Sequence, residues 1–257
     1  MSGLQHIEVA TIPIFCVNLV SSSRRRERMV TRFEHHKLLP QVTFIGAVTK
    51  DDPILDFYHT DYPIDTTSNL LMCSSACFIS HLRAVRAFYD LPSNVTHAII
   101  CEDDILLDNE FKYRLREVLD NVPQDAPLVS LSYMMNSWDG TTCSGVDPQL
   151  KNIFKFNGER IWGAQMYLIS RDYAKEVLKL YEGVPYVSQP YELHSSEIII
   201  RASNGYLCKP PLAIEDGIDS DRAPGDLPYH HNHFAFWGYE NYNSTEKQTL
   251  CPFATTK

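Results

Sequence analysis

Long hydrophobic runs are missing from this chain of 257 residues. The most apolar early stretch, residues 12–20, contains Asn18 and is much shorter than the ~20 residues that a transmembrane helix requires. No basic segment precedes this stretch, so a secretory signal peptide is not expected. We therefore expect a protein without an integral membrane segment.

An excess of positive charge is missing as well. Lys and Arg total 23 against 32 Asp and Glu, which gives a formal net charge of −9. A field of this sign repels phosphate backbones, so we expect no nucleic-acid partner. It is still compatible with a small phosphorylated ligand that is held through a metal ion.

Cysteine pairs of the kind that bind zinc are not found in the sequence. The seven cysteines are odd in number and scattered, and Cys73 and Cys77 are too far apart for a CxxC pair. This usage favours free thiols in a reducing compartment, so we expect a cytoplasmic protein.

Strand-like and helix-like segments alternate along the chain, without internal repeats or low-complexity tracts. We expect strands at residues 12–20, 42–48, 98–101, 128–133, 165–169 and 206–214. We expect helices at residues 24–36, from Ser74 or Ser75 to about Tyr89, from Asp108 to Pro123, and from Ser170 to Gly183. This alternation predicts an α/β domain with a mainly parallel central sheet.

The last part of the chain has a different composition. Beyond about Asp216 it is rich in Gly, Pro, Asp, His and aromatic residues. We interpret residues 222–257 as a loop-rich tail that covers a site on an α/β core of about residues 12–221. The prediction is therefore one domain spanning residues 1–257.

The strongest local signal is an acidic triplet at the end of a predicted buried strand. Glu102, Asp103 and Asp104 follow residues 98–101 directly, at the sheet edge where open α/β folds bind ligands. Because residues two apart in an extended chain point to the same side, Glu102 and Asp104 can converge while Asp103 faces away. Hard oxygen ligands suit Mg²⁺ or Mn²⁺. The alternative is a solvated acidic turn that caps the next helix.

Arginines follow the first predicted strand. Arg24, Arg25, Arg26 and Arg28 lie at a helix start after Asn18. Helix amino ends and guanidinium groups both favour phosphate, although Arg24 and Arg26 fit a solvated basic face. Bases after the first strand and acids after a central strand would form the two halves of a site for a nucleotide diphosphate.

Several short blocks follow one another over roughly residues 12–221 in the order and spacing of a known family. They are Asn18-Leu19 with Arg25, Arg28 and Met29; Ala47-Val48; Cys77, Ser80 and His81; Glu102-Asp103-Asp104; Gly163 with Tyr167-Leu168-Ile169-Ser170; and Pro210-Pro211-Leu212 with Ser220 and Asp221. Together they resemble glycosyltransferase family 25, which includes lipopolysaccharide and collagen β-galactosyltransferases.

The resemblance implies a single GT-A-type, Rossmann-like domain that transfers a sugar with inversion from a UDP-sugar. The expected acceptor is a hydroxyl of a glycan, glycolipid or glycoprotein, and the expected cofactor is Mn²⁺ (or Mg²⁺). Asp104 would bind the metal directly, with Glu102 or Asp103 at the donor ribose or the metal's waters. Asn18, Leu19 and Arg25 would hold the nucleotide.

Two further residues of the blocks, Ser80 and His81, are predicted to lie near the start of a buried helix. They are candidates for donor binding, with His81 at the donor sugar. A hydrogen-bonded structural histidine is the alternative for His81.

A single displacement with inversion requires a carboxylate that takes the proton of the acceptor hydroxyl. Our first choice is Glu197, since Ser195-Ser196-Glu197 can cap a helix start. Asp221 is a second candidate, together with Glu192 and Asp219.

The tail carries histidines within residues 229–233. His231 or His233 could complete the metal's ligands opposite the acidic triplet and close the tail over bound nucleotide. The alternative is an aromatic-rich loop packed on the sheet.

Two other functions compete with sugar transfer. A nucleotidyltransferase also places acids at strand ends, but it usually has a glycine-rich loop after the first strand, and residues 21–23 are all serine. A non-catalytic sugar- or nucleotide-binding module with the same fold would have no need of the intact acidic triplet.

Overall fold

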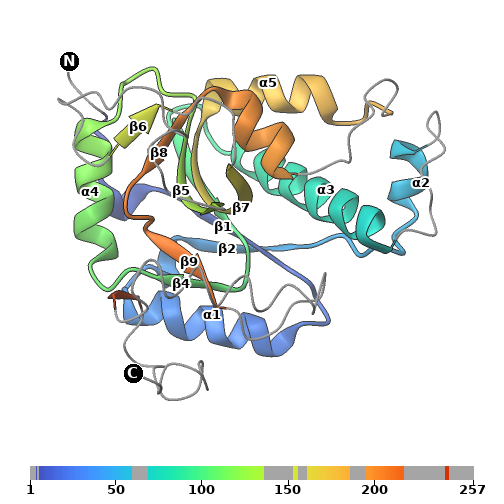
Figure 1. Ribbon diagram of the computed structural model, residues 1–257, viewed down its shortest axis with the longest axis horizontal. Helices are drawn as coiled ribbons and strands as arrows, with labels where there is room; N and C mark the ends of the chain where they lie inside the picture. The colour runs from blue at the N-terminus through green and yellow to red at the C-terminus, as the bar shows by residue number, and fades with distance from the viewer. Residues whose placement is uncertain are drawn as a thin grey trace.

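The computed structural model describes Leu4 and residues 6–59, 69–135, 153–155, 161–185, 195–216 and 241–242. A seven-stranded sheet of order β2-β1-β3-β7-β5-β8-β6 forms its centre (Figure 1). The strands of this sheet are β1 Ile14–Asn18, β2 Val42–Gly46, β3 His97–Cys101, β5 Leu128–Met135, β6 Ile153–Lys155, β7 Ile161–Ser170 and β8 Tyr206–Cys208. A second, two-stranded sheet pairs β4 Ile105–Leu107 with β9 Ala213–Glu215.

Most strands of the central sheet run in one direction. β1 is parallel to both β2 and β3, and β5 is parallel to β8. β7 is antiparallel to β3 and β5, and β6 is antiparallel to β8. Only β7 and β6 therefore run against the rest, which confirms the predicted α/β class with a mainly parallel sheet.

Helices cover both faces of the sheet (Figure 1). Their bounds are α1 Ser23–His35, α2 Ile54–Tyr58, α3 Asn69–Tyr89, α4 Phe111–Asn121 and α5 Arg171–Tyr181, with short turns η1 Val9–Thr11, η2 Leu39–Gln41, η3 Ser196–Ile200 and η4 Arg201–Ser203. One core cluster joins α1 and α4 to one face of the sheet. The other cluster joins α2, α3 and α5 to the opposite face.

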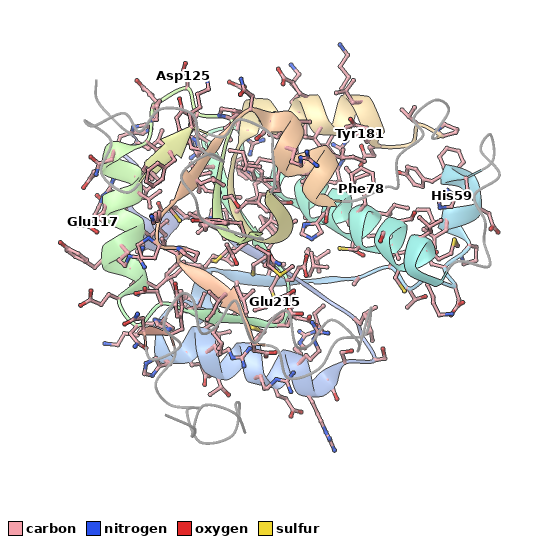
Figure 2. The ribbon with its side chains drawn as sticks, in the orientation of Figure 1. His59, Phe78, Glu117, Asp125, Tyr181 and Glu215 are labelled. Atoms are coloured by element: carbon pink, nitrogen blue, oxygen red, sulfur yellow. The ribbon has the colours of Figure 1, made fainter. Side chains whose placement is uncertain are left out.

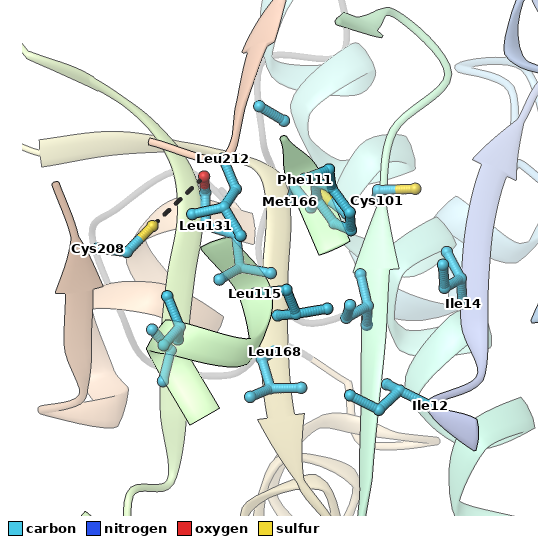
Figure 3. Close-up of a cluster of buried hydrophobic side chains, with 14 of the residues drawn as sticks. Ile12, Ile14, Cys101, Phe111, Leu115, Leu131, Met166, Leu168, Cys208 and Leu212 are labelled. Atoms are coloured by element: carbon cyan, nitrogen blue, oxygen red, sulfur yellow. Dashed lines mark hydrogen bonds between the residues drawn. The ribbon is translucent and has the colours of Figure 1, made fainter. Parts of the chain in front are cut away.

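The cluster beneath α4 shows why the predicted helical face is buried. Phe111 and Leu115 lie one helical turn apart and pack with Met166 and Leu168 of β7, all at 0–1% exposure (Figure 3). Full burial of one such side chain is worth about 1.5–3 kcal/mol. The apolar spacing of this segment therefore fixes which side of α4 faces the sheet.

The opposite face is built on the same principle. Phe78, Leu82 and Val85 of α3 are all buried, as their spacing predicts. α5 packs beside α3 (Figure 1) and begins where the hydroxyl of Ser170 accepts a hydrogen bond from the Tyr173 amide at 3.2 Å. The predicted cap at Ser170 is confirmed.

Some predicted boundaries are wrong. α3 begins at Asn69, so Ser74 and Ser75 lie inside the helix as buried residues and do not cap it. The single strand predicted at residues 206–214 is two strands in different sheets, because Pro210 and Pro211 lack the amide hydrogens that a continuous ladder requires.

Most of the predicted tail, residues 222–257, lies outside the described residues. Within it, Tyr242 is buried, its hydroxyl donates to the Pro211 carbonyl at 2.9 Å, and its backbone forms a bridge with Asp108. In the described part of the chain, no helix combines the length and the apolar character needed to cross a membrane. No disulfide joins the described cysteines to one another; these are Cys16, Cys73, Cys77, Cys101 and Cys208.

Candidate active site

Two neighbouring parallel strands end at the same edge of the sheet. β1 pairs with β3 so that Cys16 lies opposite Cys101. Asn18 closes β1, and Glu102, Asp103 and Asp104 follow β3. The fold thus brings together two segments that are far apart in the sequence, at the carboxyl edge where α/β folds bind ligands.

Arg25 of α1 contacts the acidic triplet directly. Its Nη2 atom lies 2.6 Å from Asp103 Oδ1 and 2.6 Å from Asp104 Oδ2. Asn18 Nδ2 donates to Asp103 Oδ2 at 2.6 Å. The side chains of Arg25, Asp103 and Asp104 are only 9–14% exposed and that of Glu102 is 24% exposed, so the triplet is not a solvated acidic turn. The two halves predicted from the sequence form one cluster. The prediction that Asp103 faces away is wrong, because the same Arg25 nitrogen contacts Asp103 and Asp104.

This cluster concentrates negative charge in a buried place. Burial raises the pKa of Asp103, and Arg25 and Asn18 oppose that rise only in part. Burial also raises the pKa of Asp104 well above its ordinary value, where Arg25 opposes it and the carboxylates of Glu215, Glu102 and Asp103 add to it. The ionised acids would therefore gain from a further positive charge at this place.

A third carboxylate reaches the triplet from β9. In the β4–β9 pair, Glu215 lies opposite Ile105, the residue that follows Asp104. Carboxylate oxygens of Glu102, Asp104 and Glu215 all lie within 4.8 Å of one another (Glu215 is labelled in Figure 2). Asp104 Oδ1 is buried and has no hydrogen-bond partner among the described residues. We call Glu102, Asp104 and Glu215 the carboxylate cluster.

A buried ion pair holds β9 against α1. Arg32 Nη1 lies 2.9 Å from Asp216 Oδ2, and neither side chain is exposed. The same Nη1 donates to the Ile105 carbonyl at 3.0 Å, and the Asp216 amide donates to the Asp104 carbonyl at 2.6 Å. These contacts fix the segment that carries Glu215 beside the segment that carries Asp104.

Sequence reasoning missed Glu215, Asp216 and Arg32. A signal for the first two exists, because residues 212–214 are apolar and two consecutive acids follow them. The same pattern identified the triplet after β3. Arg32 carries no such signal, since its burial depends on where α1 packs.

On the other side of Glu102, His81 of α3 is fully buried. Its Nδ1 atom lies 3.0 Å from the Tyr167 hydroxyl, and its Nε2 atom lies 3.3 Å from Glu102 Oε1. Burial alone would lower the pKa of His81, but Tyr167, Cys77 and Glu102 outweigh burial and raise that pKa well above its ordinary value. His81 is thus a hydrogen-bonded histidine in direct contact with the acidic triplet.

Two other predicted binding residues have described positions. Ser80 is buried, and its hydroxyl donates to the Ala76 carbonyl at 2.6 Å and accepts from the Val48 amide at 2.8 Å. The contact with Val48 ties α3 to the segment after β2. Leu19 follows β1 and is partly buried.

The remaining predicted site residues lie outside the described residues. They are Asp221, His231 and His233, with Glu192 and Asp219. The backbone of Glu197 belongs to η3, but its side chain is also outside the description. The general base and the histidine ligands therefore stay predictions.

One comparison with known proteins identifies a family. The family model for glycosyltransferase family 25 (LPS biosynthesis protein) matches residues 11–192, more than half of the chain. Among solved structures, 53 chains match. One is the crystal structure of a glycosyltransferase involved in the glycosylation of the major capsid of PBCV-1, at 10% sequence identity and a TM-score of 0.42, covering 88% of this chain and 98% of that chain. No curated protein matches.

Proposed function

The chain belongs to glycosyltransferase family 25, and on this premise we propose that it transfers a sugar from a UDP-sugar, with Mn²⁺ or Mg²⁺, to a hydroxyl of a glycan or glycoconjugate. Sugar transfer itself follows from the family. The nucleotide, the metal, the acceptor class and inversion at the anomeric carbon are the proposal.

The observation that carries the proposal is the carboxylate cluster. Three carboxylate oxygens from Glu102, Asp104 and Glu215 lie within 4.8 Å of one another, and Asp104 Oδ1 is buried without a hydrogen-bond partner in the described part of the chain. An all-oxygen donor set of this kind suits Mg²⁺ or Mn²⁺. The divalent ion, when bound, would neutralise negative charge on the departing diphosphate.

Arg25 and Asn18 prepare the neighbouring half of the site. Arg25 pairs with one oxygen of Asp104 and one of Asp103, and Asn18 holds the other oxygen of Asp103. Asp103 thereby fixes the guanidinium and the amide beside the cluster. We assign Arg25 and Asn18 to the donor nucleotide, because guanidinium and amide groups suit phosphate and ribose oxygens.

Inversion by a single displacement needs a base on the face opposite the leaving group. Glu197 remains the first candidate. Its backbone lies two residues beyond Ser195, whose hydroxyl is 3.6 Å from Cys77 Sγ, and Cys77 Sγ is 3.9 Å from Glu102 Oε1. The contact of Ser195, the residue before η3, with Cys77 beside Glu102 supports the assignment, with Asp221 as the second candidate.

The test uses a panel of nucleotide sugars with Mn²⁺, in which release of UDP is measured with and without glycan acceptors. We expect Asp104→Asn to lower UDP release at least ~100-fold, because removal of one electrostatic group at a transition state commonly costs this much. Asp125→Asn is the matched control, since Asp125 is exposed and lies far from Glu215 (Figure 2).

Three outcomes would overturn the proposal. Undiminished turnover in Asp104→Asn would show that the carboxylate cluster has no role in the reaction. Release of pyrophosphate in place of UDP would indicate a nucleotidyltransferase. Donor binding without transfer to any acceptor would indicate a sugar-binding module.

A further inference from the structure

A second group of metal-ligating side chains lies on the α3 side of Glu102. Cys77 and His81 are four residues apart in α3 and therefore share one face of the helix. Ligand atoms of Cys77, His81 and Glu102 all lie within 4.8 Å of one another. We propose that these three residues form a zinc site that shares Glu102 with the carboxylate cluster.

The distances between the ligand atoms fit a tetrahedral ion. Zinc bonds of ~2.3 Å to sulfur and ~2.0–2.1 Å to nitrogen and oxygen separate sulfur from oxygen by about 3.6 Å and nitrogen from oxygen by about 3.4 Å. Cys77 Sγ lies 3.9 Å from Glu102 Oε1, and His81 Nε2 lies 3.3 Å from the same oxygen. These two distances differ from the ideal values by a few tenths of an ångström or less, and all three ligand atoms lie within 4.8 Å of one another.

The surroundings orient these ligands. The Tyr167 hydroxyl lies 3.0 Å from His81 Nδ1, which leaves Nε2 turned toward Glu102. Metal-bound histidines are commonly oriented by such a partner on the other ring nitrogen. Ser195 Oγ, 3.6 Å from Cys77 Sγ, offers a hydrogen bond to the sulfur. Cys77 is partly exposed and Glu102 is 24% exposed, so an ion can enter from solvent.

The chemistry of the two groups differs. The zinc site combines sulfur, nitrogen and one oxygen, which favours Zn²⁺ over Mg²⁺ or Mn²⁺. The carboxylate cluster has only oxygens. Because both need Glu102, Zn²⁺ bound through Cys77 would withdraw Glu102 from the carboxylate cluster. We infer that Zn²⁺ inhibits the Mn²⁺-supported reaction, a consequence that rests on the proposed function.

The site itself is tested without any activity assay. Co²⁺ is added to the purified full chain, and the thiolate-to-Co²⁺ charge-transfer absorption is recorded and then titrated away with Zn²⁺. We expect an absorption that corresponds to one equivalent of bound Co²⁺ in the unmodified protein and in Cys73→Ser. We expect no such absorption in Cys77→Ser. Cys73 is the matched control, since it lies one helical turn earlier in α3 and is likewise partly buried.

A second measurement addresses inhibition. UDP release with Mn²⁺ is followed as Zn²⁺ is added, each variant being compared with its own zinc-free rate. We expect Cys77→Ser to raise the half-inhibitory Zn²⁺ concentration at least ~10-fold, because loss of a ligand's hydrogen-bond partner alone already costs about 10–100-fold in metal affinity. We expect Cys73→Ser to leave this concentration unchanged.

The outcomes separate the two proposals. An absorption that is missing from the unmodified protein, or that survives in Cys77→Ser, overturns the zinc site whatever the activity. Loss of the absorption in Cys77→Ser without any UDP release from the unmodified protein keeps the zinc site and counts against the transferase proposal. Equal Zn²⁺ inhibition of Cys77→Ser and the unmodified protein refutes the shared role of Glu102.

Discussion

The two ends of β3 bury polar groups in different ways. At its amino end, His97 is 9% exposed, and its Nε2 atom is buried without a hydrogen-bond partner in the described part of the protein. At its carboxyl end, three acids follow the strand and meet Arg25, Asn18 and His81. One end keeps its titratable group neutral, whereas the other gathers charges and compensates them.

The two ends of β3 therefore differ in role: the amino end affects the stability of the fold, and the carboxyl end is suited to binding a charged ligand. A neutral buried histidine avoids the large cost of a buried charge, and its unpartnered Nε2 atom carries only the smaller cost of an unsatisfied polar group. Burial of the acids carries a desolvation penalty, and the attraction between the carboxylates and their positively charged or hydrogen-bonding partners offsets it only when those partners are in place. The carboxyl end is therefore the part of the molecule where a cation or a phosphate changes the balance.

The largest effect expected is that of breaking the buried ion pair at the carboxyl end. Arg32→Ala removes the closer of two arginines that pair with buried Asp216 and leaves Arg28, whose Nε atom lies 3.8 Å from Asp216 Oδ2. We expect it to lower the free energy of unfolding by about 3–5 kcal/mol. Urea unfolding measures this. Lys50→Ala is the control, because its pair with Asp51 is exposed and should be worth less than ~1 kcal/mol.

A paired replacement sharpens the same comparison. Arg32→Met with Asp216→Leu removes both charges and should recover most of the lost stability, since apolar substitutes for a buried pair are often neutral. If Arg32→Ala alone costs as little as Lys50→Ala, the carboxyl end does not depend on compensated charge.

The next effect concerns Glu215. Glu215→Gln removes one charge from the carboxylate cluster, so we expect the Mn²⁺ concentration needed for half-maximal thermal stabilisation to rise about 10–100-fold, given about 1.5–3 kcal/mol for a charged contact. Glu176→Gln, an exposed position on α5, is the matched control. An unchanged Mn²⁺ requirement in Glu215→Gln would show that Glu102 and Asp104 bind the ion without Glu215.

Much of this architecture could be predicted from the sequence. The apolar spacing of α4 and α5 identifies their buried faces, and the strand that ends in three acids identifies the site edge. Arg25 could be placed at that edge because β1 and β3 are both buried strands of a mainly parallel sheet. These features follow from short stretches of sequence, so they can be predicted without knowing the contacts between distant segments.

The rest depends on contacts between distant segments. β4 and β9 are three residues each, too short for a repeating pattern, yet their pairing brings Glu215 to Asp104. β7 is antiparallel to both neighbours, a direction that no residue pattern within it encodes. α3 already includes Asn69, so it extends beyond Ser74 and Ser75, where the local capping preference predicts its start.

The amino end of β3 gives a pH-dependent effect of intermediate size. Burial, with a contribution from His6, lowers the pKa of His97 to about 4 against the pull of Asp172. The unfolded chain protonates this histidine near pH 6.5 and the folded protein near pH 4. Between these values the unfolded state binds more protons, so stability falls as the pH falls. Between pH 7 and pH 5 the loss is about 2 kcal/mol.

Replacing the histidine tests this assignment. His97→Asn should reduce the fall in unfolding free energy between pH 7 and pH 5. The fall should not vanish, because burial, followed by His35, also lowers the pKa of His36 to about 4. A pH profile in His97→Asn that matches the unmodified protein would mean that His97 is not kept neutral by the fold.

The smallest effect distinguishes positioning from stability at the carboxyl end. Tyr167→Phe removes the hydroxyl that holds His81 Nδ1 at 3.0 Å, and Tyr133→Phe removes a hydroxyl that donates to the Cys208 carbonyl at 3.0 Å. Both tyrosines are fully buried, so each variant should lose about 1 kcal/mol of unfolding free energy. Only Tyr167 acts on Glu102 through His81, so only Tyr167→Phe should also weaken Mn²⁺ stabilisation, by a few-fold. Equal Mn²⁺ responses in the two variants would show that the contacts from Tyr167 through His81 to Glu102 contribute to stability and do not position Glu102 for Mn²⁺.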